Sequence, residues 1–344
     1  MNDPNGLIYF KGQYHIFFQH NPHATHWDTM HWGHAVSKDL LHFEECEIAL
    51  YPDQPYEDEG GCFSGSAIEK DGRLYLFYTS VSKALGQTQS VAYSDDGVHF
   101  TKYEKNPVIA SFPADGSKDF RDPKVFAYQN TYYMVVGSAY NRRGRVLFYR
   151  SEDLLTWEYQ GVLYESKEYC NAIECPDFFP LGDKYVLMFS KMECRLHTTQ
   201  FVIGTFDGTT FLPESYQCPE VGPQFYAPQS FLAPDGRRLM IGWFYDWKLT
   251  PEADAVSAGA LSLPRELSLQ DGILYARPCT ESREMLLFSH PSILQEKESV
   301  TVHTKTDGDL TYYGRTTQVS VFEDTSHIEV FINDGACNIS ALIE

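Results

Sequence analysis

Short apolar and aromatic runs alternate with polar turn residues along most of the chain. Residues 7–10 are apolar and aromatic, residues 11–13 (Lys-Gly-Gln) are typical of a turn, and residues 14–18 are again rich in aromatic side chains. Runs of this composition between turn residues predict β-strands, and two of them joined by a short turn predict a hairpin. The start of the chain therefore predicts an antiparallel hairpin, with Asp3 at its open end.

A pattern of this kind recurs at a fixed interval. Residues 37–43 (Ser-Lys-Asp-Leu-Leu-His-Phe) are matched by residues 94–100 and 151–157, so each copy begins 57 residues after the one before. A weaker copy lies at 206–211, and a fifth unit begins at Ala227. Two apolar runs precede the copies, so each unit predicts an antiparallel sheet of about four strands.

These repeats predict an all-β protein in which the sheets stack on one another. A single small sheet cannot bury its faces alone, and repeated sheets of this length pack radially as propeller blades. We expect a five-bladed β-propeller at residues 1–275, a linker at 276–287, and a small or truncated β-sandwich at 288–344. A β-sandwich alone is the competing fold, but it does not account for a repeat in both spacing and motif.

Composition and charge narrow the class of partner. Aromatic residues make up 15% of the chain, which favours strands over helices. The formal net charge is -20, so nucleic acid and anionic membranes are not expected as partners, because like charges repel. No apolar stretch approaches the length of a membrane span, and no basic and apolar leader follows Met1, which favours a cytoplasmic protein.

The cysteines and acidic residues do not follow the spacing of a known metal site. The eight cysteines include no CxxC pair, so we expect mostly free thiols rather than zinc ligands or a disulfide framework. An acidic cluster could hold calcium, but the chain lacks the Asp and Asn spacing of a calcium loop. No metal is therefore expected.

Acidic residues occupy matching positions in the repeat. Asp3, Asp122 and Cys175 each precede a proline at the start of a unit, and Glu174 stands directly before Cys175. The innermost strands of a propeller line its axis, so Asp3, Asp122 and Glu174 should converge at one end of it. Like charges held together are costly and are typical of functional sites, although Arg121 offsets part of the charge. Two carboxylates across a sugar ring are the usual means of breaking a glycosidic bond.

Aromatic and amide side chains in the same loops are suited to sugars. Trp27, Phe63 and Trp243 would stack on sugar faces, and Gln19 and Ser64 could form hydrogen bonds with sugar hydroxyls. These residues predict a carbohydrate pocket around the carboxylates.

Several separate segments resemble the signature blocks of one family. In chain order they are residues 1–6 (Met-Asn-Asp-Pro-Asn-Gly), 17–22, 32–37, 63–67, 120–123 (Phe-Arg-Asp-Pro), 174–177 (Glu-Cys-Pro-Asp), 225–229, 263–267 and 328–335. Together they resemble glycoside hydrolase family 32, the β-fructosidase family of invertases, sucrose-6-phosphate hydrolases and fructan hydrolases. The resemblance covers nearly the whole chain.

The resemblance implies a retaining β-fructofuranosidase that needs no cofactor. It would release terminal β-D-fructofuranosyl residues from a small carbohydrate: sucrose, sucrose 6-phosphate or a short fructan. Asp3 would be the nucleophile, Glu174 the general acid and then base, and Asp122 the residue that binds ring hydroxyls and stabilises the transition state. The residues expected to bind the substrate are Asn2, Gln19, Trp27, Phe63, Ser64, Arg121, Tyr226 and Trp243.

Some questions stay open at this stage. An inverting arabinanase-like or xylosidase-like propeller glycosidase and a non-catalytic sugar-binding propeller are the alternative functions. Gln224 stands where the family pattern suggests an acid, and Lys191, Arg195 and His197 form a basic cluster that could bind a phosphorylated sugar. The choice of substrate and the oligomeric state are not predicted.

Overall fold

The computed structural model describes residues 1–192, 194, 196–244, 258–304 and 307–343. In this part of the chain the regular structure consists of β-strands and two short 3-10 helices, η1 (Pro55–Glu57) and η2 (Thr280–Met285). The all-β prediction is therefore confirmed. None of the described residues forms a helix with the length and apolar character needed to cross a lipid bilayer.

The first four sheets are antiparallel meanders of four strands each. The first contains β1 (Pro4–Phe10), β2 (Gln13–His20), β3 (His31–Ser37) and β4 (Phe43–Glu45). The second contains β5 (Gly61–Lys70), β6 (Arg73–Ser82), β7 (Gly86–Ser94) and β8 (Thr101–Lys102). The third contains β9 (Phe120–Tyr128), β10 (Thr131–Tyr140), β11 (Arg143–Ser151) and β12 (Glu158–Glu165). The fourth contains β13 (Ile173–Leu181), β14 (Lys184–Lys191), β15 (Thr199–Phe206) and β16 (Phe211–Gln217).

A fifth sheet follows the same order with one additional short strand. It contains β18 (Phe225–Leu232), β19 (Arg238–Phe244), β21 (Arg265–Gln270) and β22 (Ile273–Pro278), with β20 (Ala260–Leu261) paired to β19. Strand β22 thus continues past residue 275, where the sequence predicted the first domain to end.

The repeated sequence motif forms the same loop in three sheets. The hydroxyls of Ser37, Ser94 and Ser151 each accept a hydrogen bond from the backbone N–H three residues later, at 2.8–2.9 Å. The aspartate two residues after each serine accepts further backbone N–H bonds in the same loop. Each loop joins the third strand of its sheet to the fourth, so the 57-residue repeat corresponds to one sheet.

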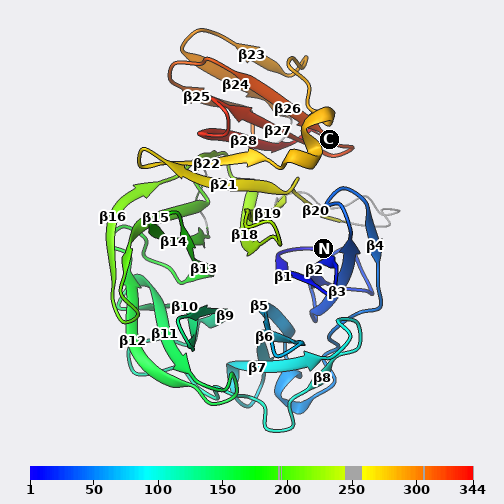
Figure 1. The fold of residues 1–344 in the computed structure, drawn as a ribbon, viewed down its shortest axis with the longest axis vertical. Helices are drawn as coiled ribbons and strands as arrows, with labels where there is room; N and C mark the ends of the chain where they lie inside the picture. The colour runs from blue at the N-terminus through cyan, green and yellow to red at the C-terminus, as the bar shows by residue number, and fades with distance from the viewer. Residues whose placement is uncertain (193, 195, 245–257, 305–306, 344) are drawn as a thin grey trace.

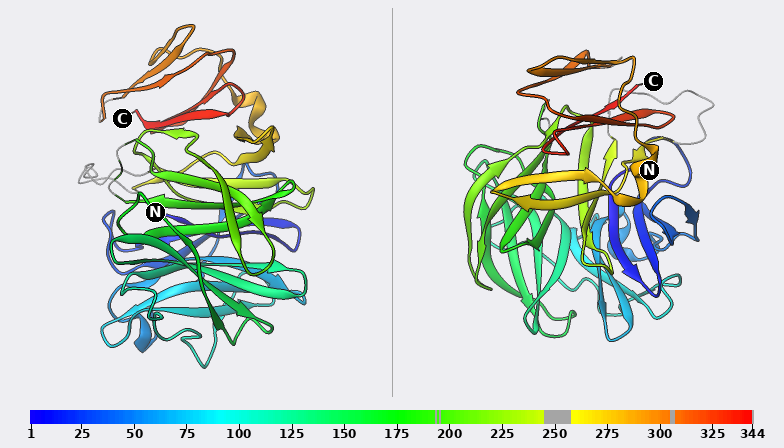
Figure 2. Two further views of the ribbon diagram at one scale, coloured as in Figure 1. Left: turned by 90° about the vertical axis from the view of Figure 1, so that its left-hand side faces the viewer. Right: turned by 45° about the horizontal axis from the view of Figure 1, so that its top comes forward.

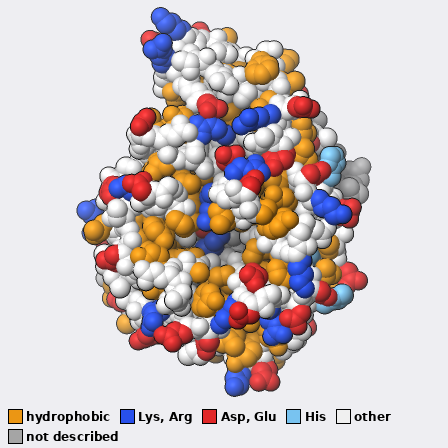
Figure 3. Space-filling model, viewed as in Figure 1, with side chains coloured by type: hydrophobic (Ala, Val, Ile, Leu, Met, Phe, Trp, Pro, Cys, Tyr) orange, Lys and Arg blue, Asp and Glu red, His pale blue; other side chains and the backbone are white. Residues whose placement is uncertain are grey.

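The five sheets lie around a common centre, with β1, β5, β9, β13 and β18 innermost (Figure 1). Each of these strands contacts the innermost strand of the next sheet, and β18 contacts β1. On the face seen in Figure 3 the middle of the ring is hollowed, and Lys and Arg side chains lie in the hollow.

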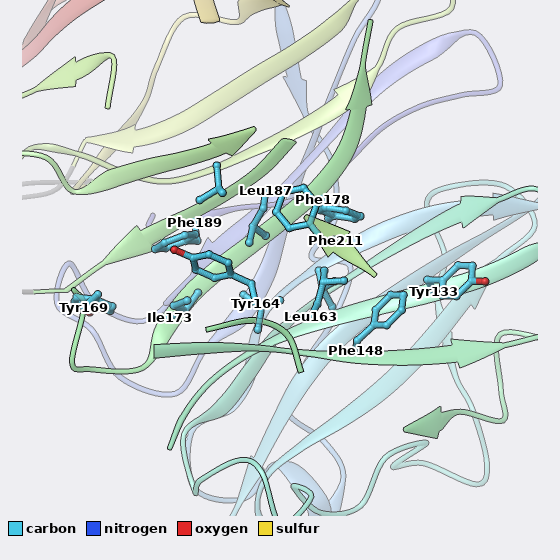
Figure 4. Close-up of a cluster of buried hydrophobic side chains, with 13 residues drawn as sticks. Tyr133, Phe148, Leu163, Tyr164, Tyr169, Ile173, Phe178, Leu187, Phe189 and Phe211 are labelled. Atoms are coloured by element: carbon cyan, nitrogen blue, oxygen red, sulfur yellow. The ribbon is translucent and has the colours of Figure 1, made fainter. Parts of the chain in front are cut away.

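Apolar side chains fill the space between neighbouring sheets. Between the third and fourth sheets, Tyr133 and Phe148 pack near Phe178 and Leu187 (Figure 4). Four further clusters lie between the other pairs of neighbouring sheets. The last of these packs Leu7 and other residues of the first sheet against the fifth sheet, so the start of the chain is held by residues more than 200 positions away. Burial of this apolar area stabilises the arrangement of the sheets.

Two further sheets lie to one side of the ring, next to β21 and β22 (Figure 2). One contains β17 (Glu220–Val221), β28 (Cys337–Leu342), β27 (His327–Ile332) and β26 (Val319–Glu323). The other contains β23 (Ile293–Gln295), β24 (Ser299–His303) and β25 (Asp309–Tyr313). They share one apolar core. Strand β17 comes from the connection between the fourth and fifth sheets. The two sheets outside the ring therefore include residues from before position 288, where the sequence predicted the second domain to begin.

A buried charge cluster joins these sheets to the ring. Arg265 donates hydrogen bonds to Glu329 at 2.6 and 2.9 Å, to Glu220 at 2.7 Å and to Ser340 at 2.7 Å. All four side chains are buried, and the guanidinium also lies 4.3 Å from the ring centre of Phe225. Phe225 directly precedes Tyr226, so this cluster supports the strand that carries one of the predicted sugar-binding residues.

Candidate active site

The predicted site residues lie around one cavity. Its volume is about 460 Å³, and it is lined by the three predicted carboxylates and by all eight predicted substrate-binding residues. The cavity lies at the beginning of the innermost strands, so segments that are far apart in the sequence meet there.

Pairing irregularities bring these side chains to the cavity. In all five ring sheets the register between the innermost strand and its neighbour shifts near the cavity, for example between Cys62 and Gly65 in β5 and between Glu174 and Asp177 in β13. A β-bulge leaves residues unpaired and turns the strand locally. Phe63 and Ser64 lie in one of these shifts.

Three residues before prolines adopt left-handed backbone conformations. The φ angles are 64° at Asp122, 47° at Cys175 and 47° at Ala227. Such angles are uncommon for residues other than glycine and are found where surrounding contacts enforce them. Here each N–H donates to a side chain of the preceding sheet: Asp122 to Thr79 at 2.9 Å, Cys175 to Asp122 at 2.8 Å and Ala227 to Ser190 at 3.0 Å. These bonds fix the sheets relative to one another at the cavity.

Asp3 is held by a hydroxyl and a thiol. Ser64 donates a hydrogen bond to Asp3 Oδ2 at 2.6 Å, and Cys175 Sγ lies 3.6 Å from the same oxygen. Burial raises the pKa of Asp3 to about 6, and the negative charge of Glu174 acts in the same direction, while the Ser64 hydrogen bond opposes the shift. Among the described residues, both side chains that donate to this carboxylate contact Oδ2.

Asp122 is the most deeply buried of the three carboxylates. Its Oδ2 accepts the Cys175 N–H at 2.8 Å, and the Cys175 thiol lies 3.6 Å away. Burial raises its pKa to about 7; Arg121 opposes the shift, and the charges of Glu174 and Asp3 add to it. Cys175 therefore contacts both Asp3 and Asp122, which places these two carboxylates on either side of one thiol.

Both carboxylate oxygens of Glu174 have donors. Arg121 donates to Oε1 from Nε at 3.1 Å and from Nη2 at 2.7 Å, and the Tyr226 hydroxyl donates to Oε2. Burial and the negative charge of Glu174 raise the pKa of Tyr226 well above its ordinary value, so this hydroxyl stays protonated and acts as a donor. The Glu174 carboxyl group is thereby fixed in orientation.

Two residues that the sequence analysis missed hold Arg121. Arg121 Nη1 donates to Asp119 Oδ1 at 3.0 Å and to Gln87 Oε1 at 3.3 Å. The neighbouring carboxylates raise the pKa of Arg121 despite its burial, so it remains charged. Asp119, Gln87 and Met192 all line the cavity. The sequence could have indicated Asp119 as a cavity residue, because it lies two positions before Arg121. Gln87 and Met192 lie at the ends of other strands, and nothing in the sequence indicated that they line the cavity.

The rest of the cavity lining includes aromatic and amide side chains. Gln19 donates from Nε2 to the Cys62 carbonyl at 3.0 Å, which fixes its amide group. The indole of Trp27 is half exposed and packs edge-on against Phe63, with ring centres 6.0 Å apart. Trp243 packs edge-on against Tyr226 at 6.4 Å. Flat apolar surfaces beside fixed amide and carboxylate groups suit a sugar ring, which has both apolar faces and hydroxyls.

Two indications from the sequence, the basic cluster and Gln224, are not supported as parts of this cavity. Lys191 and His197 do not line the cavity; Lys191 lies 3.5 Å from Gln200, and His197 contacts the Glu220 carbonyl at 2.8 Å. Arg195 lies outside the described residues. Gln224 lies against the two sheets outside the ring. It donates a hydrogen bond to Asp307 at 2.8 Å and accepts one from the Leu342 N–H.

The cysteines were expected to be mostly free, and all eight are free thiols in the structure. In the part of the chain that the structure describes, no group of three or more His, Cys, Asp or Glu side chains is arranged to hold a metal ion.

Comparison with known proteins agrees with this arrangement. Residues 1–278 match the family model described as the glycosyl hydrolases family 32 N-terminal domain. A sucrose-6-phosphate hydrolase from Escherichia coli is 41% identical over 314 residues, which cover 85% of this chain and 65% of that protein. A levanase from Bacillus subtilis is 38% identical over 302 residues, covering 78% of this chain and 43% of the levanase. The chain thus spans less than two thirds of the length of these relatives.

A solved structure agrees over the full chain. A family 32 β-fructofuranosidase from Bombyx mori, in a mutant form in complex with sucrose, superposes with a TM-score of 0.85 and 30% identity, covering 100% of this chain and 86% of that one. The matching family model, the relatives and the shared fold lead to one conclusion: the chain belongs to glycoside hydrolase family 32.

Proposed function

We propose that this protein is a retaining β-fructofuranosidase that acts on sucrose, sucrose 6-phosphate or a short fructan. The observation that carries the proposal is the meeting of Asp3, Asp122 and Glu174, from three different sheets, in one cavity of about 460 Å³. The family membership and the names of the relatives support the same substrate class.

In the first half of the reaction Asp3 attacks the anomeric carbon of the fructosyl unit. The bond between that carbon and the glycosidic oxygen breaks while Glu174 gives its proton to the departing oxygen. In the second half Glu174 takes a proton from water, which attacks the same carbon and releases fructose from Asp3. Arg121 and Tyr226 hold the two oxygens of Glu174, so its orientation is maintained for both steps.

Asp122 and Ser64 assist without forming a covalent bond. Asp122 would accept hydrogen bonds from ring hydroxyls, and its negative charge would stabilise the positive charge that develops on the ring. The Ser64 hydroxyl keeps Asp3 oriented through Oδ2, which leaves Oδ1 for the attack. Trp27, Phe63 and Trp243 would pack against the sugar and exclude water.

We further infer that the five ring sheets are the blades of a five-bladed β-propeller and that the two remaining sheets form a β-sandwich. The ring arrangement and the shared apolar clusters support this division. The end of β22 at Pro278 favours a boundary after that residue, with η2 in the linker that extends to residue 287.

The test is incubation of the purified chain with sucrose, sucrose 6-phosphate, 1-kestose, inulin and levan, with ¹H NMR of the first product. Release of fructose whose initial anomer is β supports the proposal. An initial α anomer would indicate the inverting alternative, because water then displaces the leaving group directly from the opposite face of the ring. Sugar binding without turnover by a folded chain would indicate a non-catalytic sugar-binding protein.

A further inference from the structure

A second cavity adjoins the first. Its volume is about 450 Å³, and it shares Asp119, Arg121 and Met192 with the cavity that holds the carboxylates. Arg121 binds Glu174, the residue proposed to protonate the leaving group. The second cavity therefore begins on the side of the site where the leaving group, rather than the fructosyl unit, would lie.

A short turn of the third sheet forms the outer wall of this cavity. Strands β10 and β11 are joined by Asn141 and Arg142 alone, whereas β2 and β3 of the first sheet are joined by residues 21–30. Both turn residues line the second cavity, together with Tyr140, Ser117 and Asn171. A volume of this size is in the range of small-molecule sites.

Arg142 stands at a turn position where glycine is usual. The φ angles are 48° at Asn141 and 59° at Arg142, the conformation of a two-residue hairpin turn in which Asn-Gly is the favoured sequence. A long side chain at the second position costs conformational energy that glycine does not. The cation is thus carried by a two-residue turn at the cavity wall.

The nearby arginines differ in their partners. Arg143 pairs with Glu165 at 2.9 Å, and Arg145 pairs with Glu165 at 2.6 Å. Arg142 has no hydrogen bond or ion pair with any residue that the structure describes. Asp119, the carboxylate in the shared wall, is paired with Arg121 at 3.0 Å, and Arg121 also pairs with Glu174 at 2.7 Å, so Arg121 is already committed to two carboxylates. The Arg142 guanidinium is therefore available to attract an anion at this cavity. The formal net charge of the whole chain, -20, would by itself repel one.

We propose that the second cavity is a subsite for an anionic leaving group, a hexose phosphate, and that Arg142 binds its phosphate. The inference rests on the proposed β-fructofuranosidase function and specifies its substrate class. Guanidinium groups bind phosphate oxygens through two parallel hydrogen bonds, and Asn141 and Ser117 in the same lining can bind sugar hydroxyls. Arg142 is then a specificity-determining residue for sucrose 6-phosphate over sucrose.

Isothermal titration of the full chain with glucose 6-phosphate, glucose and inorganic phosphate tests the subsite without catalysis. Glucose 6-phosphate should bind at least about ten-fold more tightly than glucose or inorganic phosphate, and Arg142→Gln should remove that advantage. Arg143→Gln is the matched control, because it removes a neighbouring guanidinium that does not line the cavity. Equal binding of glucose and glucose 6-phosphate, tighter binding of inorganic phosphate, or an Arg142→Gln protein with unchanged preference would overturn the proposal.

Kinetics give an independent measure. The ratio of kcat/KM for sucrose 6-phosphate to that for sucrose should fall about ten-fold in Arg142→Gln, mainly through KM, and stay at the wild-type value in Arg143→Gln. An unchanged ratio in an active Arg142→Gln protein also overturns the proposal. If the wild type hydrolyses no β-fructoside, the proposed function fails, and the titrations still decide whether the subsite exists.

Discussion

Arg121 donates two hydrogen bonds to the same carboxylate oxygen of Glu174, from Nε at 3.1 Å and from Nη2 at 2.7 Å. Arg121 therefore holds one oxygen of this carboxyl group while Tyr226 holds the other, and Asp119 and Gln87 in turn hold Arg121. This chain of contacts connects the loop before β9 with the start of β13.

The geometry of this pair predicts that charge alone cannot replace Arg121. Arg121→Lys keeps the positive charge but loses the planar pair of donors, so kcat should fall by about 10- to 100-fold. The control is Arg73→Lys, since Arg73 forms a similar two-donor pair with Asp95 at an exposed position. Steady-state kinetics on sucrose check the prediction, and near-wild-type kcat in Arg121→Lys would contradict it.

The proposed roles of the two reacting carboxylates differ in their dependence on the leaving group. Asp3→Asn should lower turnover by roughly 10³-fold or more on every substrate, because no covalent intermediate can form. Glu174→Gln should lower turnover of sucrose by a similar factor. Its turnover of p-nitrophenyl β-D-fructofuranoside should fall far less, because that leaving group needs little protonation. Glu152→Gln, at an exposed position, is the control. Equal losses of Glu174→Gln on both substrates would exclude its role as the acid.

The hydroxyl of Ser64 is predicted to set the acidic limb of the pH profile. Its hydrogen bond opposes the upward shift that burial imposes on the pKa of Asp3, so Ser64→Ala should raise that pKa further above about 6. Asp3 and Asp122 must both be ionised, so the acidic limb of kcat/KM depends on both pKa values, and the further rise at Asp3 moves this limb to higher pH. Ser299→Ala is a matched control, since Ser299 donates to the exposed Glu296. A limb that stays in place in Ser64→Ala would rule this account out.

Ionisation of the buried Asp122 carboxyl is predicted to lower the free energy of unfolding as the pH rises. Its pKa is raised from 3.8 to about 7, so below pH 4 the carboxyl is protonated in both folded and unfolded protein, and above pH 7 the folded protein carries the full cost of a buried charge. The free energy of unfolding should therefore fall between pH 4 and pH 7. Asp3, with its pKa raised to about 6, contributes in the same direction.

Asp122→Asn tests this directly. The neutral amide avoids the buried charge and asparagine tolerates the left-handed backbone, so the variant should gain on the order of 4 kcal/mol at pH 8 relative to pH 4. Urea unfolding at the two pH values measures the difference, and activity should be lost. The same pH dependence in variant and wild type would refute the assignment.

Removal of Arg265 should destabilise the whole chain. Arg265→Met leaves Glu220 and Glu329 buried without their cation, which costs about 3–5 kcal/mol for a pair of this kind. Arg150→Met removes an arginine whose pair with Glu152 is exposed, and the expected change there is within about 1 kcal/mol. Chemical denaturation of both variants decides the point; similar losses in the two would contradict it.

The sequence by itself determined the strands, the 57-residue repeat and which three carboxylates meet at one cavity. Each of these features can be recognised from a short stretch of sequence. A run of apolar residues marks each strand, a serine and the aspartate after it (Ser37, Ser94 or Ser151) mark each repeated loop, and a nearby proline marks each carboxylate. Local patterns of this kind need no knowledge of distant contacts.

The tertiary structure alone decided which groups act on those carboxylates. Gln87, at the start of β7, and Met192, just after β14, reach the cavity from outside the segments that resemble the family blocks. Arg142 has no carboxylate partner among the described residues, while Arg143 and Arg145 both pair with Glu165, and β17 joins a sheet more than 100 residues away. The pKa values of Asp3 and Asp122 likewise follow from burial by other sheets. Such properties depend on which residues meet after folding, and neighbours in space are not neighbours in sequence.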